Sequence, residues 1–536
     1  MADKFDMAAA AVRSGTFSIR AAAREYGVTY STLHGRLNGA SDALRVTPAD
    51  IGKEERIKAR GERRAPKPEP GMLRRFILTC AQNNTKVHNN LWANLSALAA
   101  HYGADIMVSR FTYDIAAQGA RGAKPGTERA KEDIWFDPRI ASFVCDDRIE
   151  LARGLVFCGE LNILPTAARP LSGLETYTGR RSMIVPHVKL AMESIASGKH
   201  EPTKFCYTTG AVTLRNYIQK KAGQKAEFHH CYGALLVEVN DEGEWWVRQL
   251  NADSGGVIYD LTLRAKDGVV TDGHRAEALN WGDIHVARLE PEQRQVNWGN
   301  GGIAETLNPK FQFMHDTFDM RARNHHEAKN AHARFARFVQ GEEDVREEVR
   351  HAANFLASTL RAGCDTVVVD SNHDNALVRW LRDADFKTDP VNAVFYLEAQ
   401  LAYYKALAAG LTSFHMLEWA TAHVLAAPAP ITFLSEDESF VICKDANGGI
   451  ECGMHGHLGP NGARGSAAAF AKMGRKANVG HTHSAGIYDG IYTAGVSGSL
   501  DLEYNVGPSS WSHSHIVTYA NGKRAILTVW NGKWRA

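Results

Sequence analysis

The residues of this sequence that could do chemistry are aspartates, histidines and an asparagine that recur in five short segments between residues 283 and 483. Asp283 and His285 stand two apart at the end of a predicted strand, so both side chains can face one side. The third segment, CDTVVVDSNHDN, runs from a β-branched strand straight into polar residues. Carboxylate, amide and imidazole groups together suit Mn²⁺, Mg²⁺, Fe or Zn²⁺. In chain order the segments are LNWGDIHV, FMHDTFDMRARNHHEAKNAHARF, CDTVVVDSNHDN, IECGMHGHLGPNGARGS and VGHTHSAG.

The order D-x-H, D-x-x-D, N-H-D, H, G-H-x-H resembles the calcineurin-like metallophosphoesterase superfamily. The sequence departs from that pattern at His315 and Ser371, where the family usually has glycine, but neither change removes a liganding atom. The resemblance implies two divalent ions, with Mn²⁺ expected first, that share a bridging Asp316. One ion would be held by Asp283, His285 and His483, and the other by Asn372, His455 and His481. His457 stays open as an alternative to His455.

The same resemblance assigns roles beside the metal ligands. His373 would face the leaving oxygen as general acid or transition-state stabiliser, with Asp374 as its orienting partner. Asp319 would support the ligands or the start of a helix rather than bind metal. Arg464 could contact a substrate phosphate or be an ordinary surface residue. His513 and His515 fall outside the five segments, and we expect them on a strand surface or at the rim of the site.

Residues 4–38 are predicted to form three short helices with a turn, YGVTYST, before the third. The segment resembles the pipsqueak-type helix-turn-helix, which would place the third helix in a DNA groove. A small helical protein-interaction module is the alternative. The residues that carry the resemblance are Ala10, Val12, Gly15, Ser18, Arg20, Ala22, Ala23, Tyr26, Gly27, Val28, Ser31, Thr32, Leu33, Arg36 and Leu37. Those offered to DNA are Tyr30, Ser31, Thr32, His34 and Arg36.

The sequence predicts four parts: a helix-turn-helix (1–39), a basic flexible linker (40–74), an α/β region of unclear role (75–275) and the metal-binding region (276–536). The fold class is α/β: a two-sheet metallophosphoesterase sandwich flanked by helices, preceded by an α/β region and a three-helix domain. In the third part we expect strands in RRFILTCAQ, ADIMVSRFTYD, GLVFCGEL, KFCYTTG, GALLVEV and EWWVRQLN, and helices in NNLWANLSALAAHYG and VPHVKLAMESIASG.

Bulk composition limits the function classes. The 536 residues carry a net charge of +2, so attraction to nucleic acid must be local. The eight cysteines contain no CxxC pair, which favours buried, reduced thiols. No run of 18 apolar residues occurs, so we expect no membrane-spanning segment and a cytoplasmic protein, in the host cytoplasm if a phage encodes it.

A second resemblance covers residues 75–536 and rests on AQNNTKVH, HDTFDMRARNHH, MHGHLGPNGARGS and SSWSHSHIVTYANGKRAILTV. These segments are similar to the first-step DNA-transfer proteins of T5-like phages, which implies a metal-dependent DNA nuclease linked to DNA entry or host DNA breakdown. DNA is the expected partner, and self-association of the middle region stays open. Two alternatives remain: a phosphatase acting on nucleotides or phosphoproteins, and a DNA-binding transfer or regulatory protein that does not cut.

Overall fold

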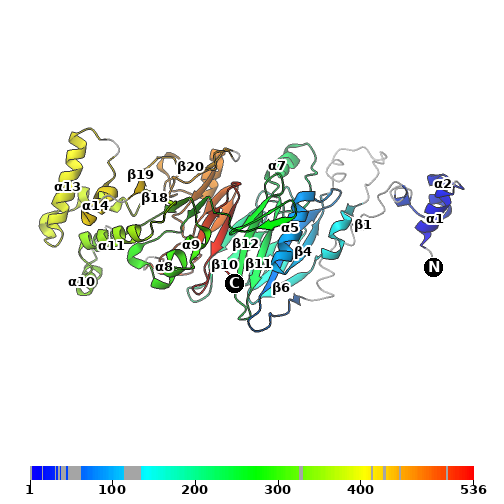
Figure 1. Cartoon of the computed structure of the whole chain (residues 1–536), viewed down its shortest axis with the longest axis horizontal. Coiled ribbons are helices and arrows are strands. Elements are labelled where there is room, and N and C mark those ends of the chain that lie inside the picture. Colours follow the sequence, from blue (N-terminus) through cyan, green and yellow to red (C-terminus); the bar gives the residue numbers. More distant parts are fainter. Residues whose placement is uncertain are drawn as a thin grey trace.

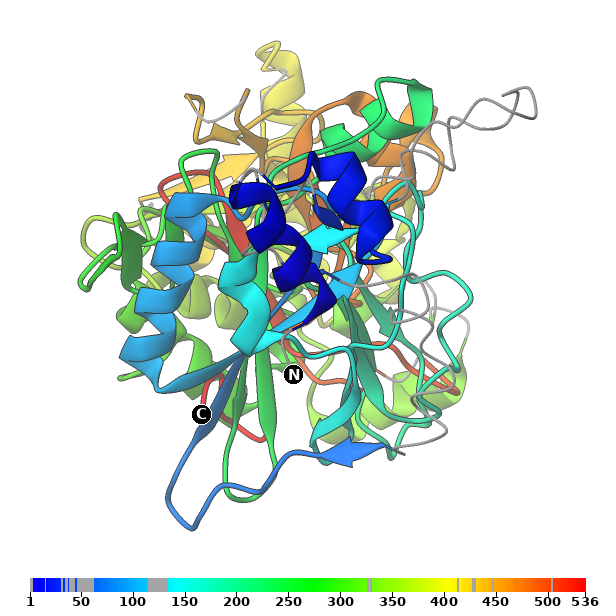
Figure 2. The same cartoon turned by 90° about the vertical axis from the view of Figure 1, so that its right-hand side faces the viewer.

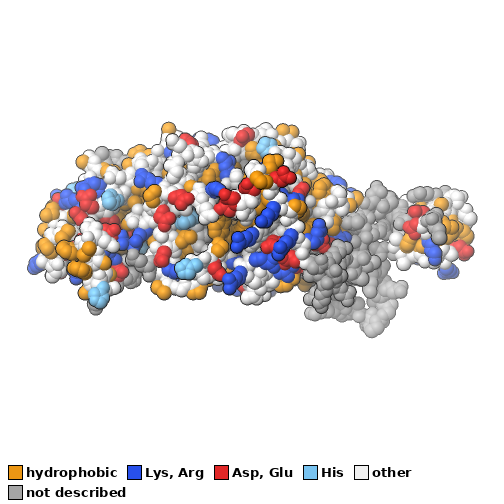
Figure 3. Space-filling model, turned by 90° about the horizontal axis from the view of Figure 1, so that it is seen from below, with side chains coloured by type: hydrophobic (Ala, Val, Ile, Leu, Met, Phe, Trp, Pro, Cys, Tyr) orange, Lys and Arg blue, Asp and Glu red, His pale blue; other side chains and the backbone are white. Residues whose placement is uncertain are grey.

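The structure, a computed structural model, is an elongated mixed α/β arrangement with several sheets (Figure 1). It describes residues 3–14, 16–29, 32–33, 37, 44–45, 62–113, 134–324, 327, 330–411, 414–426, 430–445, 448–502 and 505–536. Among the described residues, none of the helices combines the length and apolar character that crossing a bilayer requires. Figure 3 shows charged side chains of both signs interspersed over one face, as the small net charge predicts.

A six-stranded sheet carries three of the five polar segments. Its order is β19-β18-β17-β16-β25-β26, and its first four strands are parallel. Apolar side chains such as Phe313 and Val367 line these strands because both faces of the sheet are covered. The bounds are β16 Ala278–Asn280, β17 Phe311–Met314, β18 Asp365–Val369, β19 Ile431–Leu434, β25 Ser514–Thr518 and β26 Arg524–Thr528.

An eleven-stranded sheet carries the other two segments and runs through both the middle and the carboxyl-terminal regions. Its order is β2-β6-β7-β8-β10-β9-β23-β24-β22-β21-β20. The amino-terminal half consists of β2 Arg63–Arg64, β6 Arg148–Ala152, β7 Leu155–Cys158, β8 Ser182–Val185, β9 Met192–Ile195 and β10 Lys204–Thr208. The other half consists of β20 Val441–Ile442, β21 Ile450–Glu451, β22 Lys476–Val479, β23 Gly486–Tyr488 and β24 Ile491–Thr493.

The two large sheets enclose a shared apolar layer. Phe313 and Val367 of the six-stranded sheet form one buried cluster with Ile442, Ile450 and Cys452 of the eleven-stranded sheet. This face-to-face packing is the arrangement expected of a two-layer core. The polar loops at one edge of both sheets are therefore held on a rigid base.

A four-stranded sheet, in the order β12-β11-β3-β4, completes the middle region. Its strands are β3 Arg74–Gln82, β4 Ala104–Phe111, β11 Gly233–Val239 and β12 Trp245–Asn251. Helix α5 (Asn89–Tyr102) crosses over between β3 and β4, ends at Gly103 in the left-handed conformation, and packs Leu91, Leu95 and Leu98 on the sheet (Figure 2). These elements confirm the predictions for this part of the chain. Small flanking elements are β5 Trp135–Phe136, β13 Ile258–Asp260, β14 Leu263–Lys266, β15 Val269–Thr271 and α7 Lys221–His229.

Helices cover the remaining surfaces of the carboxyl-terminal region. A helical end piece packs around Trp380, Phe395 and Leu417 and lies at the left of Figure 1. It contains α10 Ala331–Gln340, α11 Val345–Ser358, α12 Ala376–Asp383, α13 Ala393–Ala408 and α14 Met416–Leu425. Three further helices lie between strands of the two large sheets in the sequence: α8 Pro291–Trp298, α9 Ile303–Leu307 and α15 Ala467–Phe470.

The amino-terminal segment contains α1 (Lys4–Arg13) and α2 (Ile19–Glu25), drawn dark blue in Figure 2. Ser18 caps α2 by accepting a hydrogen bond from the Ala21 N–H, and Gly27, just after the helix, is left-handed. Much of the predicted third helix lies outside the described residues. Leu33 is described, and it packs against the alanines of α1 and α2.

One sequence prediction needs correction. The predicted helix over 185–198 is wrong, because Met192–Ile195 forms β9, which pairs with β10 and β23. This β9–β23 pairing joins strands from both sides of the boundary predicted at residue 276 in one sheet. Within the predicted linker, 40–74, Arg63 and Arg64 form β2 and pair with Asp147 and Glu150 at 2.6 and 2.9 Å, and β1 (Leu44–Arg45) pairs with β5.

Candidate metal centre

The five polar segments meet where strands of the two large sheets end. Asp283 follows β16, Asp316 follows β17 and Asn372 follows β18, and because these strands are parallel their carboxyl ends share one edge. His455 follows β21 and His481 follows β22, which are parallel neighbours in the facing sheet. The sequence prediction that these residues gather at one site agrees with the structure.

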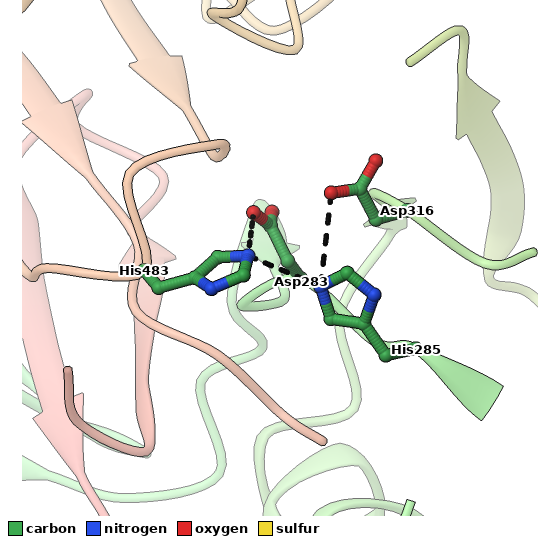
Figure 4. A group of neighbouring side chains, drawn as sticks. All are labelled: Asp283, His285, Asp316 and His483. Atoms are coloured by element: carbon green, nitrogen blue, oxygen red, sulfur yellow. Dashed lines mark hydrogen bonds and ion pairs between the residues drawn. The ribbon is translucent and has the colours of Figure 1, made fainter. Parts of the chain in front are cut away.

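Asp283, His285, Asp316 and His483 form a buried cluster with ligand atoms within 4.8 Å of one another (Figure 4). His483 Nε2 lies 3.0 Å from Asp283 Oδ2 and 3.1 Å from His285 Nε2. His285 Nε2 is also 3.8 Å from Asp316 Oδ2. Three of these side chains are the proposed ligands of the first ion, and the fourth is the proposed bridge.

Several acceptor atoms around this cluster are buried with no hydrogen-bond partner. Among the described residues, Asn372 Oδ1, Asp316 Oδ1 and His455 Nε2 are of this kind. His455 Nε2 lies 3.4 Å from Asp316 Oδ1. Burying such groups unpaired costs roughly 1–3 kcal/mol each, and a divalent cation would satisfy them together. The residues present therefore fit a metal ion.

The backbone at the ligands is strained in a way that turns the side chains inward. His285, Asp316, His481 and His483 have φ of 48°, 46°, 70° and 55°, in the left-handed region that few non-glycine residues adopt. Gly480 is required by close approach, because a Cβ there would lie 2.2 Å from Asp283 Oδ1. These features cluster at functional sites, where the surroundings hold an unfavourable conformation in place.

Burial and the neighbouring charges shift the pKa values of these side chains in opposite directions. Burial and the Asp316 carboxylate raise the pKa of Asp283 well above its usual range. Burial opposes ionisation of Asp316 as well, but the imidazoles of His373 and His285, whose own pKa values are raised, hold its pKa well below the usual range. Burial also holds the pKa values of His455 and His483 well below that of free histidine. These neutral rings offer lone pairs, which is the form that binds a metal.

His455 fits the site better than its alternative. Its side chain is buried beside Asp316, whereas His457 Nε2 lies 3.3 Å from Glu436 Oε2 near the surface. Behind it, His455 Nδ1 is 3.4 Å from Nδ1 of the buried His315, whose pKa is lowered by burial to about 4. Donation from His455 Nδ1 to His315 Nδ1 would leave a lone pair on His455 Nε2, the atom that faces Asp316. The histidine that departs from the family pattern thus orients a proposed ligand.

The predicted partnership of His373 with Asp374 is corrected. His373 Nδ1 lies 3.4 Å from Asp319 Oδ1, and the same oxygen accepts a 2.6 Å hydrogen bond from His285 Nδ1. Burial would lower the pKa of His373, but Asp316 and Asp319 raise it to about 10. Asp374 instead accepts from the Phe318 N–H at 2.9 Å and the Thr317 hydroxyl at 3.2 Å, and so holds the loop after β17. Asp319 is the carboxylate that contacts both histidines.

Comparison with known proteins places this geometry in a wider context. Residues 2–45 match the helix-turn-helix, Psq domain family. The chain is 42% identical to Protein A1 of Escherichia phage T5 over 476 residues, which cover 86% of this chain and 83% of that protein. It belongs to the phage T5 Protein A1 family. No solved structure matches it, so the site of this A1-family member is described from its own geometry.

The site of this A1-family chain opens into a cavity of about 530 Å³. Its walls include Asn372, His373, His481, Arg464, Thr482 and Trp511. The ring of Trp511 stands edge-on to that of His483, with centroids 4.2 Å apart. Arg464 is exposed on the wall, a position from which it can reach a phosphate.

Sequence reasoning missed three contributors in this A1-family chain: His315, Gly480 and Trp511. The glycine before His481 was a usable signal, because close approach favours glycine, whereas nothing in the spacing marked Trp511. The expectation for His513 and His515 was also wrong. Both are largely buried: His513 Nε2 lies 2.9 Å from the Gly498 carbonyl, and His515 accepts a hydrogen bond from the Gly282 N–H at 3.1 Å, one residue before Asp283.

Of the residues offered to DNA by the helix-turn-helix, only Thr32 is described. Its hydroxyl accepts a 2.6 Å hydrogen bond from that of Thr29, which fits the start of a third helix. Tyr30, Ser31, His34 and Arg36 lie outside the described residues. The family match over residues 2–45 confirms the helix-turn-helix resemblance itself.

Proposed function

We propose that this protein is a metal-dependent phosphodiesterase that hydrolyses DNA. The observation that carries the proposal is the buried Asp283, His285, Asp316 and His483 cluster, with acceptor atoms left unpaired beside an open cavity. A buried cluster of this composition is costly to keep without a ligand, and acid–imidazole sets at strand ends suit metal-assisted hydrolysis of phosphate esters.

The ligand assignment follows the contacts. Asp283, His285 and His483 would hold one divalent ion and Asn372, His455 and His481 a second, with Asp316 between them; Mn²⁺ is the first choice and Mg²⁺, Fe or Zn²⁺ the others. Bound ions would supply electrophilic stabilisation of a phosphate group and a more acidic water molecule.

The protein's own side chains complete the chemistry. His373 faces the cavity with its ring fixed by Asp319, so it can hold a proton beside the leaving oxygen of the cleaved ester. Arg464, which also lines the cavity, would supply a charge-assisted hydrogen bond to a non-bridging phosphate oxygen.

DNA is the substrate in this proposal because of what accompanies the site. The Psq-type helix-turn-helix would retain the enzyme on duplex DNA, with Tyr30, Ser31, Thr32, His34 and Arg36 in the groove. Membership in the T5 Protein A1 family agrees with a phage protein that acts inside the host cell, in DNA transfer or in breakdown of host DNA. In this proposal, residues of the cavity bind the phosphate group, and the helix-turn-helix directs the enzyme to DNA.

The experiment uses metal-stripped full-length protein with linear and circular double-stranded DNA, restoring Mn²⁺, Mg²⁺ or Zn²⁺ one at a time. Cleavage should return with metal and fall by at least about a hundred-fold in Asp316→Asn. His373→Ala should lose cleavage while still binding metal. His457→Ala is the matched control, because His457 lies beside Glu436 rather than the cluster.

Each outcome has a definite reading. Normal metal-restored cleavage by Asp316→Asn would contradict the site assignment. Hydrolysis of a chromogenic phosphomonoester without any cutting of DNA would favour a phosphatase. Metal binding and tight DNA binding with no hydrolysis would favour a transfer or regulatory protein.

A further inference from the structure

Helix α13 is apolar on two opposite faces. One face packs inward through Phe395, Tyr396, Ala399 and Ala406. The other exposes large apolar side chains to solvent: Val394, Leu397, Leu401, Tyr404 and Leu407 are 65%, 49%, 56%, 65% and 54% exposed. A surface helix is usually apolar on its inner face alone, so the outer face calls for a covering partner.

The exposed residues have the spacing of a coiled-coil seam. Val394, Leu397, Leu401, Tyr404 and Ala408 recur at alternating steps of three and four along one side of the helix. This is the a and d pattern by which one helix packs into another of the same kind. Helix α10 also exposes Phe335, Phe338 and Val339, but these span little more than one turn. Figure 3 shows hydrophobic side chains gathered at this end of the molecule.

The seam is complementary to itself when two copies run antiparallel. About a two-fold axis between residues 402 and 403, Leu401 faces Tyr404 of the second copy and Leu397 faces its Ala408. Val394 then faces the carboxyl end of the other helix, where Leu411 folds back and is 54% exposed. Every apolar layer is matched in this one register, as an isologous interface requires.

Charge agrees with the same register. Glu398 and Lys405 flank the seam on one side, each one residue after a d position. In the antiparallel pair Glu398 of one copy lies beside Lys405 of the other, and the symmetry repeats this pair. Glu398 also contacts Arg346 and, at 3.1 Å, His423 of its own chain, which fixes its carboxylate beside the seam. A parallel pair would not bring these two positions together.

We propose that the outer face of α13 is a dimer interface, and that its partner is α13 of a second copy of this chain, packed antiparallel. The interface lies in the helical end piece, not in the middle region that the sequence left open. The site of each copy stays complete without the other, so the proposal stands apart from the proposed activity.

Analytical ultracentrifugation of the full-length protein tests the dimer. The wild type should sediment at twice the chain mass of 58.9 kDa, and Leu401→Glu should sediment as single chains. Leu164→Glu is the matched control: Leu164 is 52% exposed in the middle region, so its replacement should leave the dimer intact. Circular dichroism of each variant checks the fold. A wild type that stays monomeric at all micromolar concentrations, or a Leu401→Glu variant that still dimerises, would overturn the proposal.

Two further variants test the register. Lys405→Glu places like charges beside each other, so dimerisation should weaken several-fold at low salt and recover as salt screens the repulsion. Val394→Cys should give no disulfide-linked dimer beyond the wild-type background, because the two copies of residue 394 lie at opposite ends of an antiparallel seam. Leu401→Cys lies near the axis and should be linked by a short bis-maleimide. A Val394→Cys disulfide, or a Lys405→Glu dimer as tight as wild type at low salt, would overturn the antiparallel arrangement.

Discussion

Two clusters in this molecule bury carboxylates beside nitrogen-bearing side chains. They differ in whether their buried polar atoms have hydrogen-bond partners. In the middle region, Arg248 is 2% exposed and bonds to Glu238 at 2.5 Å and to Asp260 at 2.8 and 2.9 Å. Arg75 and Tyr102 bond to the same two carboxylates at 2.8 and 2.6 Å. At the candidate metal centre, by contrast, several buried polar atoms of the described residues, such as Asn372 Oδ1 and His455 Nε2, have no hydrogen-bond partner. A saturated cluster, whose buried polar atoms have hydrogen-bond partners, indicates a structural role. An unsaturated cluster, in which several such atoms lack partners, indicates a place for a ligand.

The most direct test of this comparison is to remove the positive charge of Arg248 from the saturated cluster. Arg248→Met leaves Glu238 and Asp260 buried without their main partner, so the free energy of unfolding should fall by about 3–5 kcal/mol. Chemical denaturation measures the change. Arg63→Met, at an exposed pair with Asp147, is the control and should cost less than about 1 kcal/mol. Equal losses in the two variants would mean that the Arg248 cluster is not structural.

The unsaturated cluster should respond to metal instead. At about 100 times its dissociation constant, Mn²⁺ should raise the unfolding free energy of metal-stripped protein by about 2.7 kcal/mol. Asp283→Asn should lose most of that gain, because a ligand is missing. Arg248→Met should keep it, though from a lower starting stability. Thermal unfolding with and without metal gives both values, and an undiminished gain in Asp283→Asn would contradict the ligand assignment.

A smaller effect is expected from changing His315, which contacts the proposed ligand His455 but is not a proposed ligand itself. His315→Phe removes the nitrogen that orients His455, so metal affinity should weaken about 10–100-fold while the apolar packing is largely kept. Calorimetric titration of metal into stripped protein measures the affinity. His457→Phe is the control and should bind as wild type, and a similar loss in both variants would restore His457 as a ligand.

The smallest effect concerns pH. Burial opposes ionisation of Glu238, but Arg248 and Arg75 lower its pKa below the usual value. A carboxyl whose pKa is depressed in the folded state adds stability above its unfolded pKa, near 4.5, and that stability is lost as the pH falls. Wild type should therefore lose more unfolding free energy than Glu238→Gln between pH 7 and 3, with each unit of pKa difference worth about 1.4 kcal/mol. Parallel losses in the two proteins would contradict this.

The sequence predicted much of the site because residue type and order were enough to find it. Asp283, His285 and His483 meet through the ends of parallel strands, a property of topology that spacing reveals. It named Asp374 rather than Asp319 as the partner of His373, whereas His373 contacts Asp319. Both carboxylates lie close in sequence to proposed ligands, so spacing alone does not separate them.

The failures in the fold have a similar cause. Residues 185–198 have an apolar pattern compatible with a helix, but Met192–Ile195 is held as a strand by β10 on one side and β23 on the other. A partner almost 300 residues away overrides local preference. The same long-range pair joins strands from both sides of the predicted boundary at residue 276. Local elements such as β3, α5 and β4 were predicted well because they form one contiguous unit.

The position of β25 has a consequence for when the site can form during synthesis. Strand β16, which presents Asp283, lies between β17 and β25, and His515 of β25 bonds to the backbone just before Asp283. A growing chain therefore lacks the strand beside β16 until residues 514–518 have left the ribosome. On the proposed function, the chain could not cut DNA before β25 has been synthesised and has paired with β16.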